Sequence, residues 1–249
     1  SAWLLTTVGD FYTSTLCLCG IIIATDGGVV GGAWSLAICL LGGPFACAYV
    51  VRRLHQHRTL RLQCWYKDND KRVFGTHEVT PDVNVWIAFY TVLGLSFFTL
   101  LASTLCEHPL FPFRMGDVGW TSAWLLTTVG DFYTSTLCLC GIIIATDGGV
   151  VGGAWSLAIC LLGGPFACAY VVRRLHQHRT LRLQCWYKDN DKRVFGTHEV
   201  TPDVNVWIAF YTVLGLSFFT LLASTLCEHP LFPFRMGDVG WTSAWLLTT

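Results

Sequence analysis

Charged side chains are scarce in this chain of 249 residues. Asp, Glu, Lys and Arg together make up 13% of it, about half of the roughly 25% that is usual in soluble domains. The 16 basic and 16 acidic residues cancel, so there is no basic excess with which to displace counterions from nucleic acid. Hydrophobic residues make up 53%, which excludes a disordered chain. The composition therefore indicates a membrane protein without a nucleic-acid partner.

Motifs that carry catalysis or bind metals are also lacking. The sequence holds no Cys-x-x-Cys pair, which is the common element of zinc and iron–sulfur sites. It has no Ser/His/Asp arrangement, no paired catalytic carboxylates and no phosphate-binding lysine motif. The sequence therefore predicts no catalytic residue and no enzyme activity, and it contains no motif of a zinc or iron–sulfur site.

An exact internal repeat dominates what is present. Residues Ser1 to Thr121 recur unchanged as Ser122 to Thr242, and Ser243 to Thr249 begin a third copy. A period of 121 residues is too long for a solenoid and has the size of a small domain. If a unit is taken to begin at Asp82, the residue before the apolar segment Val83–Cys106, the chain divides into a partial unit (1–81), a complete unit (82–202) and a second partial unit (203–249).

Each unit contains three apolar segments of the length that spans a membrane, which is about 20 residues. The segments lack the strict alternation of barrel strands. We therefore predict an all-α integral membrane bundle with three transmembrane helices per unit and six visible spans. The predicted spans are Ala2–Thr25, Gly28–Val51, Val83–Cys106, Ala123–Thr146, Gly149–Val172 and Val204–Cys227.

The odd number of predicted spans per unit creates a topological problem. The loop between Arg52 and Asp82 has seven basic and four acidic residues, and basic loops prefer the cytoplasmic, stromal or matrix side. Three spans per unit would place this loop and its copy on opposite sides. Three alternatives remain open: the chain is cut between units, one segment does not span, or the copies form an inverted pair as in several transporters.

An acid within a predicted span is the clearest candidate for a polar site. Asp10 and its copy Asp131 are flanked at helical offsets by hydroxyl side chains, and an intramembrane acid is a functional hypothesis by default. A proton or cation site, a pigment or lipid ligand, and a purely structural contact between helices are the alternatives. The predicted site comprises Asp10, Asp131, Thr6, Thr127, Ser14 and Ser135.

Three further groups of residues are candidate contacts. Two overlapping pairs of glycines four residues apart, Gly27 with Gly31 and Gly28 with Gly32, allow close helix packing, and a Gly-Gly-Pro triplet at Gly42 should kink its helix. Arginines at the end of the same segment could contact anionic headgroups, and an acid–histidine pair after residue 106 could bind a pigment or metal. These groups are Gly28, Gly32, Gly149 and Gly153 for packing, Arg52, Arg53, Arg173 and Arg174 for lipid, and Glu107, His108, Glu228 and His229 for pigment.

One unit contains a series of short motifs, namely a Trp, a Thr pair, an Asp-x-Tyr, a second Trp, a Gly pair and a late Tyr: Trp124, Thr127, Thr128, Asp131, Tyr133, Trp155, Gly163, Gly164 and Tyr170. Together these motifs resemble a family of small three-helix plant and algal membrane proteins of unknown function. The resemblance implies a photosynthetic eukaryote and an integral membrane location. It transfers no activity and no catalytic residue.

These observations lead to two principal functional hypotheses. The first is an accessory subunit of a larger membrane complex, such as a photosystem–antenna supercomplex in a thylakoid or other organelle membrane, with chlorophyll, carotenoid or bound lipid as cofactors and other membrane subunits as partners. A respiratory complex is the next option for the same role. The second is a small transporter or channel that is built from inverted repeats around the intramembrane Asp.

Overall fold

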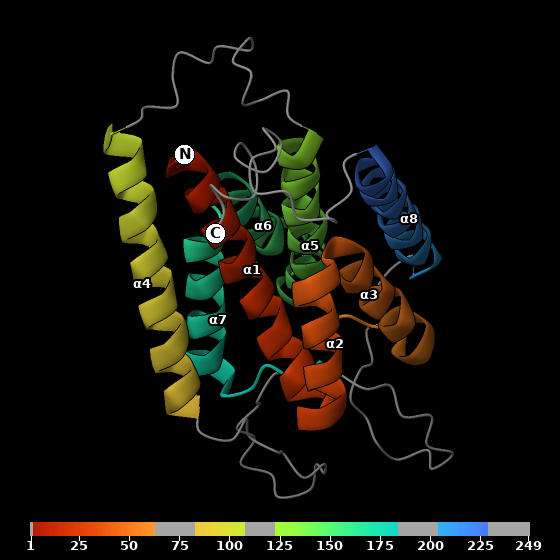
Figure 1. Cartoon of the computed structure of the whole chain (residues 1–249). Coiled ribbons are helices and arrows are strands. Elements are labelled where there is room, and N and C mark those ends of the chain that lie inside the picture. Colours follow the sequence, from red (N-terminus) through yellow and green to blue (C-terminus); the bar gives the residue numbers. More distant parts are fainter. Residues whose placement is uncertain (1, 63–82, 108–122, 184–203, 229–249) are drawn as a thin grey trace, which may run out of the picture.

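The computed structural model describes residues 2–62, 83–107, 123–183 and 204–228, and this part of the chain is helical apart from one isolated β-bridge. Figure 1 shows the helices side by side in one bundle, with the same helix order in both copies. The helices of the first copy are α1 (Ala2–Asp26), α2 (Gly28–Leu41), α3 (Gly43–His57) and α4 (Val83–Glu107), and those of the second are α5 (Ala123–Asp147), α6 (Gly149–Leu162), α7 (Gly164–His178) and α8 (Val204–Glu228).

Four helices are long and apolar enough to cross a membrane, namely α1, α4, α5 and α8. They match two of the three predicted spans of each unit to within one residue at either end. The all-α prediction is thus confirmed for the described residues, and the four helices indicate a membrane protein. The prediction of six spans is not confirmed, because the third segment of each unit is divided into two short helices.

The division falls at the Gly-Gly-Pro triplet and makes a re-entrant hairpin where a kinked span was expected. Helix α2 has 14 residues, which gives about 21 Å at 1.5 Å per residue and is too short for a hydrocarbon core of about 30 Å. The last part of α3 returns to the start of α2: the Arg52 guanidinium of α3 lies 3.1 Å from the carboxylate of Asp26, which ends α1 just before α2. The predicted span Gly28–Val51 therefore begins and ends at the same end of the bundle.

The two copies run parallel to each other. Thr6, near the start of α1, bonds Thr104, near the end of α4, so α4 returns antiparallel to α1. The chain segments that follow α3 and α7 meet in an antiparallel bridge between Leu62 and Leu183, and Leu183 N–H bonds Thr25 at the end of α1. Both basic loops thus begin at the same end of the bundle. The odd number of predicted spans per unit left three alternatives, and this structure corresponds to the one in which a segment of each unit does not span.

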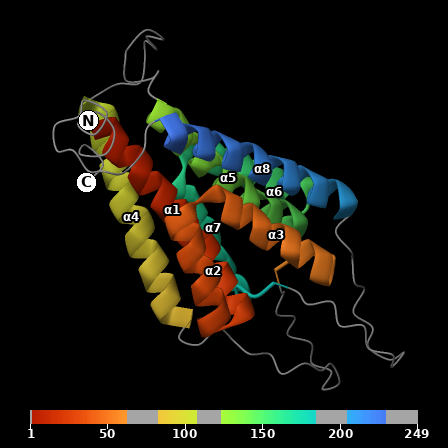
Figure 2. The same cartoon turned by 45° about the vertical axis from the view of Figure 1, so that its right-hand side comes forward.

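The second arm of each re-entrant hairpin packs against the other copy, whereas the first arm, α2 or α6, packs on α1 or α5 of its own copy. Helix α3 packs chiefly on α5 and α8 of the second copy, while α7 packs on α1 and α4 of the first; Figure 2 shows α3 lying beside α8. The core between them is apolar and includes the fully buried Leu18, Ile22 and Ile38. Each copy therefore buries the second arm of its hairpin by means of the other copy.

Candidate functional site: polar contacts that join the copies

The first polar contact lies at the tip of each hairpin. The backbone N–H of Gly43, at the start of α3, donates a hydrogen bond to the carboxylate of Asp131 in the other copy. The N–H of Gly164 donates to Asp10 in the same way. A carboxylate at this position satisfies one of the free N–H groups of a helix N-terminus and complements its partial positive charge. Each predicted intramembrane acid therefore caps a half-helix of the opposite copy.

Backbone geometry explains why glycine stands at the tip. Gly42 ends α2 with a φ of 75°, in a region that residues with a side chain rarely adopt. A Cβ atom on Gly42 would also collide with the Asp131 carboxylate. Pro44 then begins α3 at a position where its missing N–H is no loss. The Gly-Gly-Pro triplet thus ends one helix and begins the next, whereas its sequence predicts only a kink.

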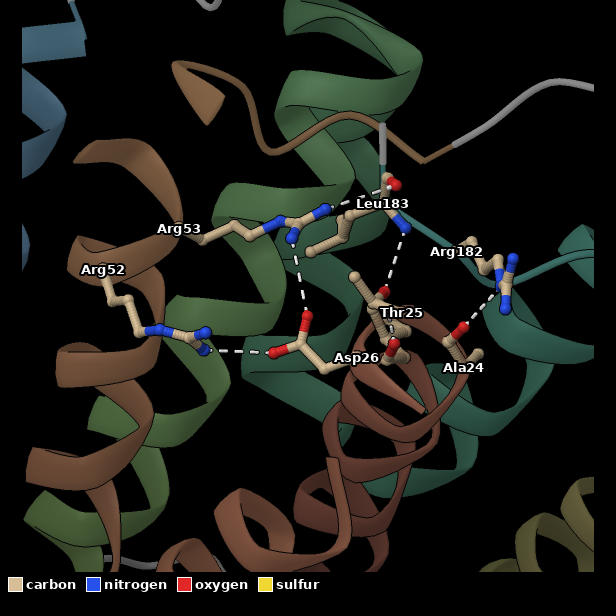
Figure 3. Close-up of polar contacts among 8 residues, drawn as sticks. Ala24, Thr25, Asp26, Arg52, Arg53, Arg182 and Leu183 are labelled. Carbon is tan, nitrogen blue, oxygen red and sulfur yellow. Dashed lines mark hydrogen bonds and ion pairs between the residues drawn. The ribbon is translucent and has the colours of Figure 1, made fainter. Parts of the chain in front are cut away.

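The second polar contact lies at the base of each hairpin and is drawn in Figure 3. Asp26 accepts from Arg52 at 3.1 Å and from Arg53 at 3.5 Å. Arg53 also donates to the carbonyl oxygen of Leu183 in the other copy at 3.5 Å. We call Asp26, Arg53 and Leu183, together with the symmetric set Asp147, Arg174 and Leu62, the basal clasp.

Further contacts around the basal clasp also cross between the copies. Arg182 donates through Nε to the carbonyl oxygen of Ala24 at 2.7 Å, and the N–H of Leu183 donates to Thr25 at 3.0 Å. Arg61 and Leu62 make the equivalent bonds to Ala145 and Thr146. The arginine bonds satisfy carbonyl groups at the ends of α1 and α5, which lack partners inside their own helices, while the leucine N–H groups donate to threonine hydroxyl oxygens.

The predicted lipid-headgroup role of the arginines needs correction for one arginine of each pair. The side chains of Arg53 and Arg174 are only 4% exposed, so they cannot reach a headgroup. The side chains of Arg52 and Arg173 are 36% and 35% exposed, and each lies over a tryptophan ring of its own hairpin. Sequence reasoning also missed Asp26, although an acid followed by two glycines between apolar segments was a usable signal.

The hydroxyl groups predicted to surround Asp10 face different neighbours. Thr6 bonds Thr104 of α4 at 2.9 Å, and Thr127 bonds Thr225 of α8 at 3.0 Å. Ser14 and Ser135 are buried, and their hydroxyls have no hydrogen-bond partner within the described residues. The structure therefore does not gather the predicted polar site into one cluster.

Close helix packing occurs at a glycine of only one of the two predicted G-x-x-x-G pairs. A Cβ atom on Gly28 or Gly32 would meet no atom within 4 Å, and the same holds for Gly149 and Gly153. A Cβ on Gly31 would lie 2.7 Å from the backbone of Ile23. Gly31, with its copy Gly152, is thus the glycine that lets α2 approach α1, and the packing role predicted for Gly28, Gly32, Gly149 and Gly153 is corrected to this member of the other pair.

The predicted pigment ligands are not tested by this geometry. His108 and His229 lie outside the described residues, and Glu107 and Glu228 end α4 and α8. Among the described residues, no group of three or more His, Cys, Asp or Glu side chains could hold a metal ion.

Comparison of the chain with protein-family models, with curated proteins and with solved structures gives no match. The class of protein is therefore defined by the fold and the site alone. It is a helical membrane protein with two parallel copies, in which the second arm of each re-entrant hairpin packs on the other copy and the copies bond each other at the tip and at the base.

Proposed function

We propose that the protein is an accessory transmembrane subunit with a structural role in a larger membrane assembly. Its strongest polar groups are engaged inside the molecule: Asp10 and Asp131 cap helices of the opposite copy, and Arg53 and Arg174 are held in the basal clasp. A charged side chain that is already hydrogen-bonded inside the protein has little freedom to bind or to transform a substrate.

The observation that carries this proposal is the outward face of α4 and α8. Only 17% of the span window of each helix is buried inside the protein. The exposed apolar side chains follow one stripe at spacings of three and four residues, which favours packing against another helix or against lipid. On α4 the stripe comprises Val85, Phe89, Val92, Leu95 and Phe98.

The more specific form of the proposal is a subunit of a photosystem–antenna supercomplex in a thylakoid or other organelle membrane. Its support is the resemblance to the plant and algal family, together with aromatic rings on the outer stripe that could pack on chlorophyll or carotenoid. His108, His229 and the adjoining acids remain candidate pigment ligands. A respiratory complex is the alternative assembly.

Purification from native membranes in a mild detergent tests this proposal. We expect the protein to elute with a much larger complex and with pigment absorption in the same fractions. Respiratory subunits in those fractions would identify the alternative assembly. Elution as a free protein, with neither pigment nor other subunits, would overturn the accessory role.

A transporter or channel is a second candidate, and one observation favours it. Each re-entrant hairpin presents a helix N-terminus and a carboxylate deep within the span region, an arrangement that can face an ion. The observation supports a transporter or channel but not one built from inverted repeats, because the two copies run parallel. We expect this candidate to require ion or proton flux in proteoliposomes that falls when both Asp10 and Asp131 are changed to Asn, with Gly32→Ala as a control. Flux that is absent in the unmodified protein would exclude it.

A further inference from the structure

Eight cysteines lie in four close pairs within the described residues. Two pairs join α1 to α2 or α5 to α6 within one copy, with Sγ atoms 4.0 Å apart for Cys19–Cys39 and 3.9 Å apart for Cys140–Cys160. Two pairs cross between the copies, with Sγ atoms 3.6 Å apart for Cys17–Cys168 and Cys47–Cys138. All eight are free thiols.

The two kinds of pair differ in exposure. Cys17 and Cys168 are 0% and 1% exposed, so an oxidant has no route to either sulfur atom. Cys39 is partly exposed and stands on α2 between Leu36 and Leu40, which are 61% and 73% exposed. Accessible thiols are the ones that oxidants reach, so the pairs within each copy are the reactive ones.

The surroundings of Cys39 select the kind of oxidant. Cys39 lies 11 residues after the start of α2, which is about 17 Å along the helix, and its exposed neighbours are apolar. A water-soluble oxidant would have to leave water to reach this depth. A lipid-soluble oxidant is already in the hydrocarbon region that these side chains face.

We propose that Cys19–Cys39 and Cys140–Cys160 are oxidation sites at which a lipid-soluble quinone converts two thiols into a disulfide. One S–S bond forms and two S–H bonds break, and the quinone takes up both electrons and both protons to leave as the quinol. All reactants and products are uncharged, so the reaction creates no buried ion in a medium of low dielectric constant. The sulfur atoms must approach by about 2 Å to reach the disulfide bond length.

The disulfide would fasten the hairpin to the long helix of its own copy. Cys39 stands three residues before the glycine that ends α2, close to the tip that Asp131 caps. Oxidation therefore links the first arm of the hairpin covalently to α1, whereas the thiol form leaves this contact non-covalent.

Full-length variants that retain only two cysteines test the proposal. The first retains Cys19 and Cys39, the second the buried pair Cys17 and Cys168, and the third the mismatched pair Cys19 and Cys160, with all other cysteines changed to Ser or Ala. Each variant is placed in proteoliposomes with a fully ring-substituted, short-chain benzoquinone. Quinol is followed by absorbance, free thiols by maleimide labelling after denaturation, and the adduct by intact mass.

We expect the first variant to lose both thiols, to yield one quinol per chain and to lose the mass of two hydrogen atoms. The second should react at least tenfold more slowly, and the third should form no disulfide within its chain. Hydrogen peroxide should oxidise the first variant at least tenfold more slowly than the quinone does. Circular dichroism and gel filtration identify any variant that fails to fold, and the unmodified chain should still lose the mass of four hydrogen atoms.

Three results would overturn the proposal. One is a first variant that folds but keeps its thiols, and another is equal oxidation of the first and second variants. The third is a gain of mass equal to one quinone, because this would show addition of the quinone to sulfur instead of disulfide formation.

Discussion

Gly31 and Gly32 are neighbours in sequence and have opposite surroundings. A Cβ on Gly31 would lie 2.7 Å from the Ile23 backbone, while one on Gly32 would meet nothing within 4 Å. Since a backbone atom cannot move aside cheaply, Gly31→Ala should lower the free energy of unfolding by about 1–3 kcal/mol, as overpacking does.

Gly32→Ala is the matched control for that change. It should leave stability unchanged or raise it by up to about 1 kcal/mol, because alanine favours helix more than glycine does. The measurement is thermal or denaturant unfolding in detergent. Equal effects of the two substitutions would contradict the close approach of α2 to α1.

The helix cap formed by Asp131 leads to a second prediction at the residue scale. Its carboxylate accepts from Gly43 N–H at the start of α3, so Asp131→Ala removes a helix cap and should cost about 0.5–2 kcal/mol. Asp131→Asn retains an oxygen acceptor and should cost less. Unfolding curves of the two variants in detergent test the difference, and an Ala variant as stable as the Asn variant would show that the cap contributes nothing.

At the scale of elements, the basal clasp holds the re-entrant hairpin closed. Asp26 and Arg53 have side chains that are 9% and 4% exposed, so removal of one leaves the other charge buried with fewer partners. We expect Asp26→Ala to lower the free energy of unfolding by about 3–5 kcal/mol, the usual cost of breaking a buried pair.

Arg52 provides the control for the clasp. It contacts the same carboxylate, but its side chain is 36% exposed, so Arg52→Ala should cost no more than about 1 kcal/mol. Urea or SDS titration followed by circular dichroism measures both variants. A cost for Arg52→Ala as large as that for Asp26→Ala would mean that burial does not set the strength of the clasp.

At the scale of the whole molecule, the parallel copies make a prediction about topology. Gln56 and Gln177 are exposed near the ends of α3 and α7, which lie at the same end of the bundle. In a cysteine-free chain, Gln56→Cys and Gln177→Cys should both be labelled from one side of the membrane by an impermeant maleimide.

Native Cys106 serves as the control for this experiment. It is exposed near the end of α4, at the opposite end of the bundle, and as the only cysteine it should be labelled from the other side. Labelling of Gln56→Cys and Gln177→Cys from opposite sides would establish the inverted arrangement instead.

Much of the fold follows from local properties of the chain. The helical class and the bounds of α1, α4, α5 and α8 were predictable because length and apolar composition alone make a segment able to span a membrane. The break at Gly42 was visible only as a kink, since glycine and proline permit an interruption without dictating how far the chain turns. The turn depends on a carboxylate that lies 88 residues away.

The sequence by itself determined that this is a helical membrane protein with two identical units and an acid inside each first helix. Only the tertiary structure decided the partners of Asp131, Arg53 and Gly31, and with them that the copies are parallel and that α3 and α7 pack on the opposite copy. The physical reason is the identity of the repeats. A contact within one copy and the same contact between copies involve identical residues, so only packing in space can distinguish them.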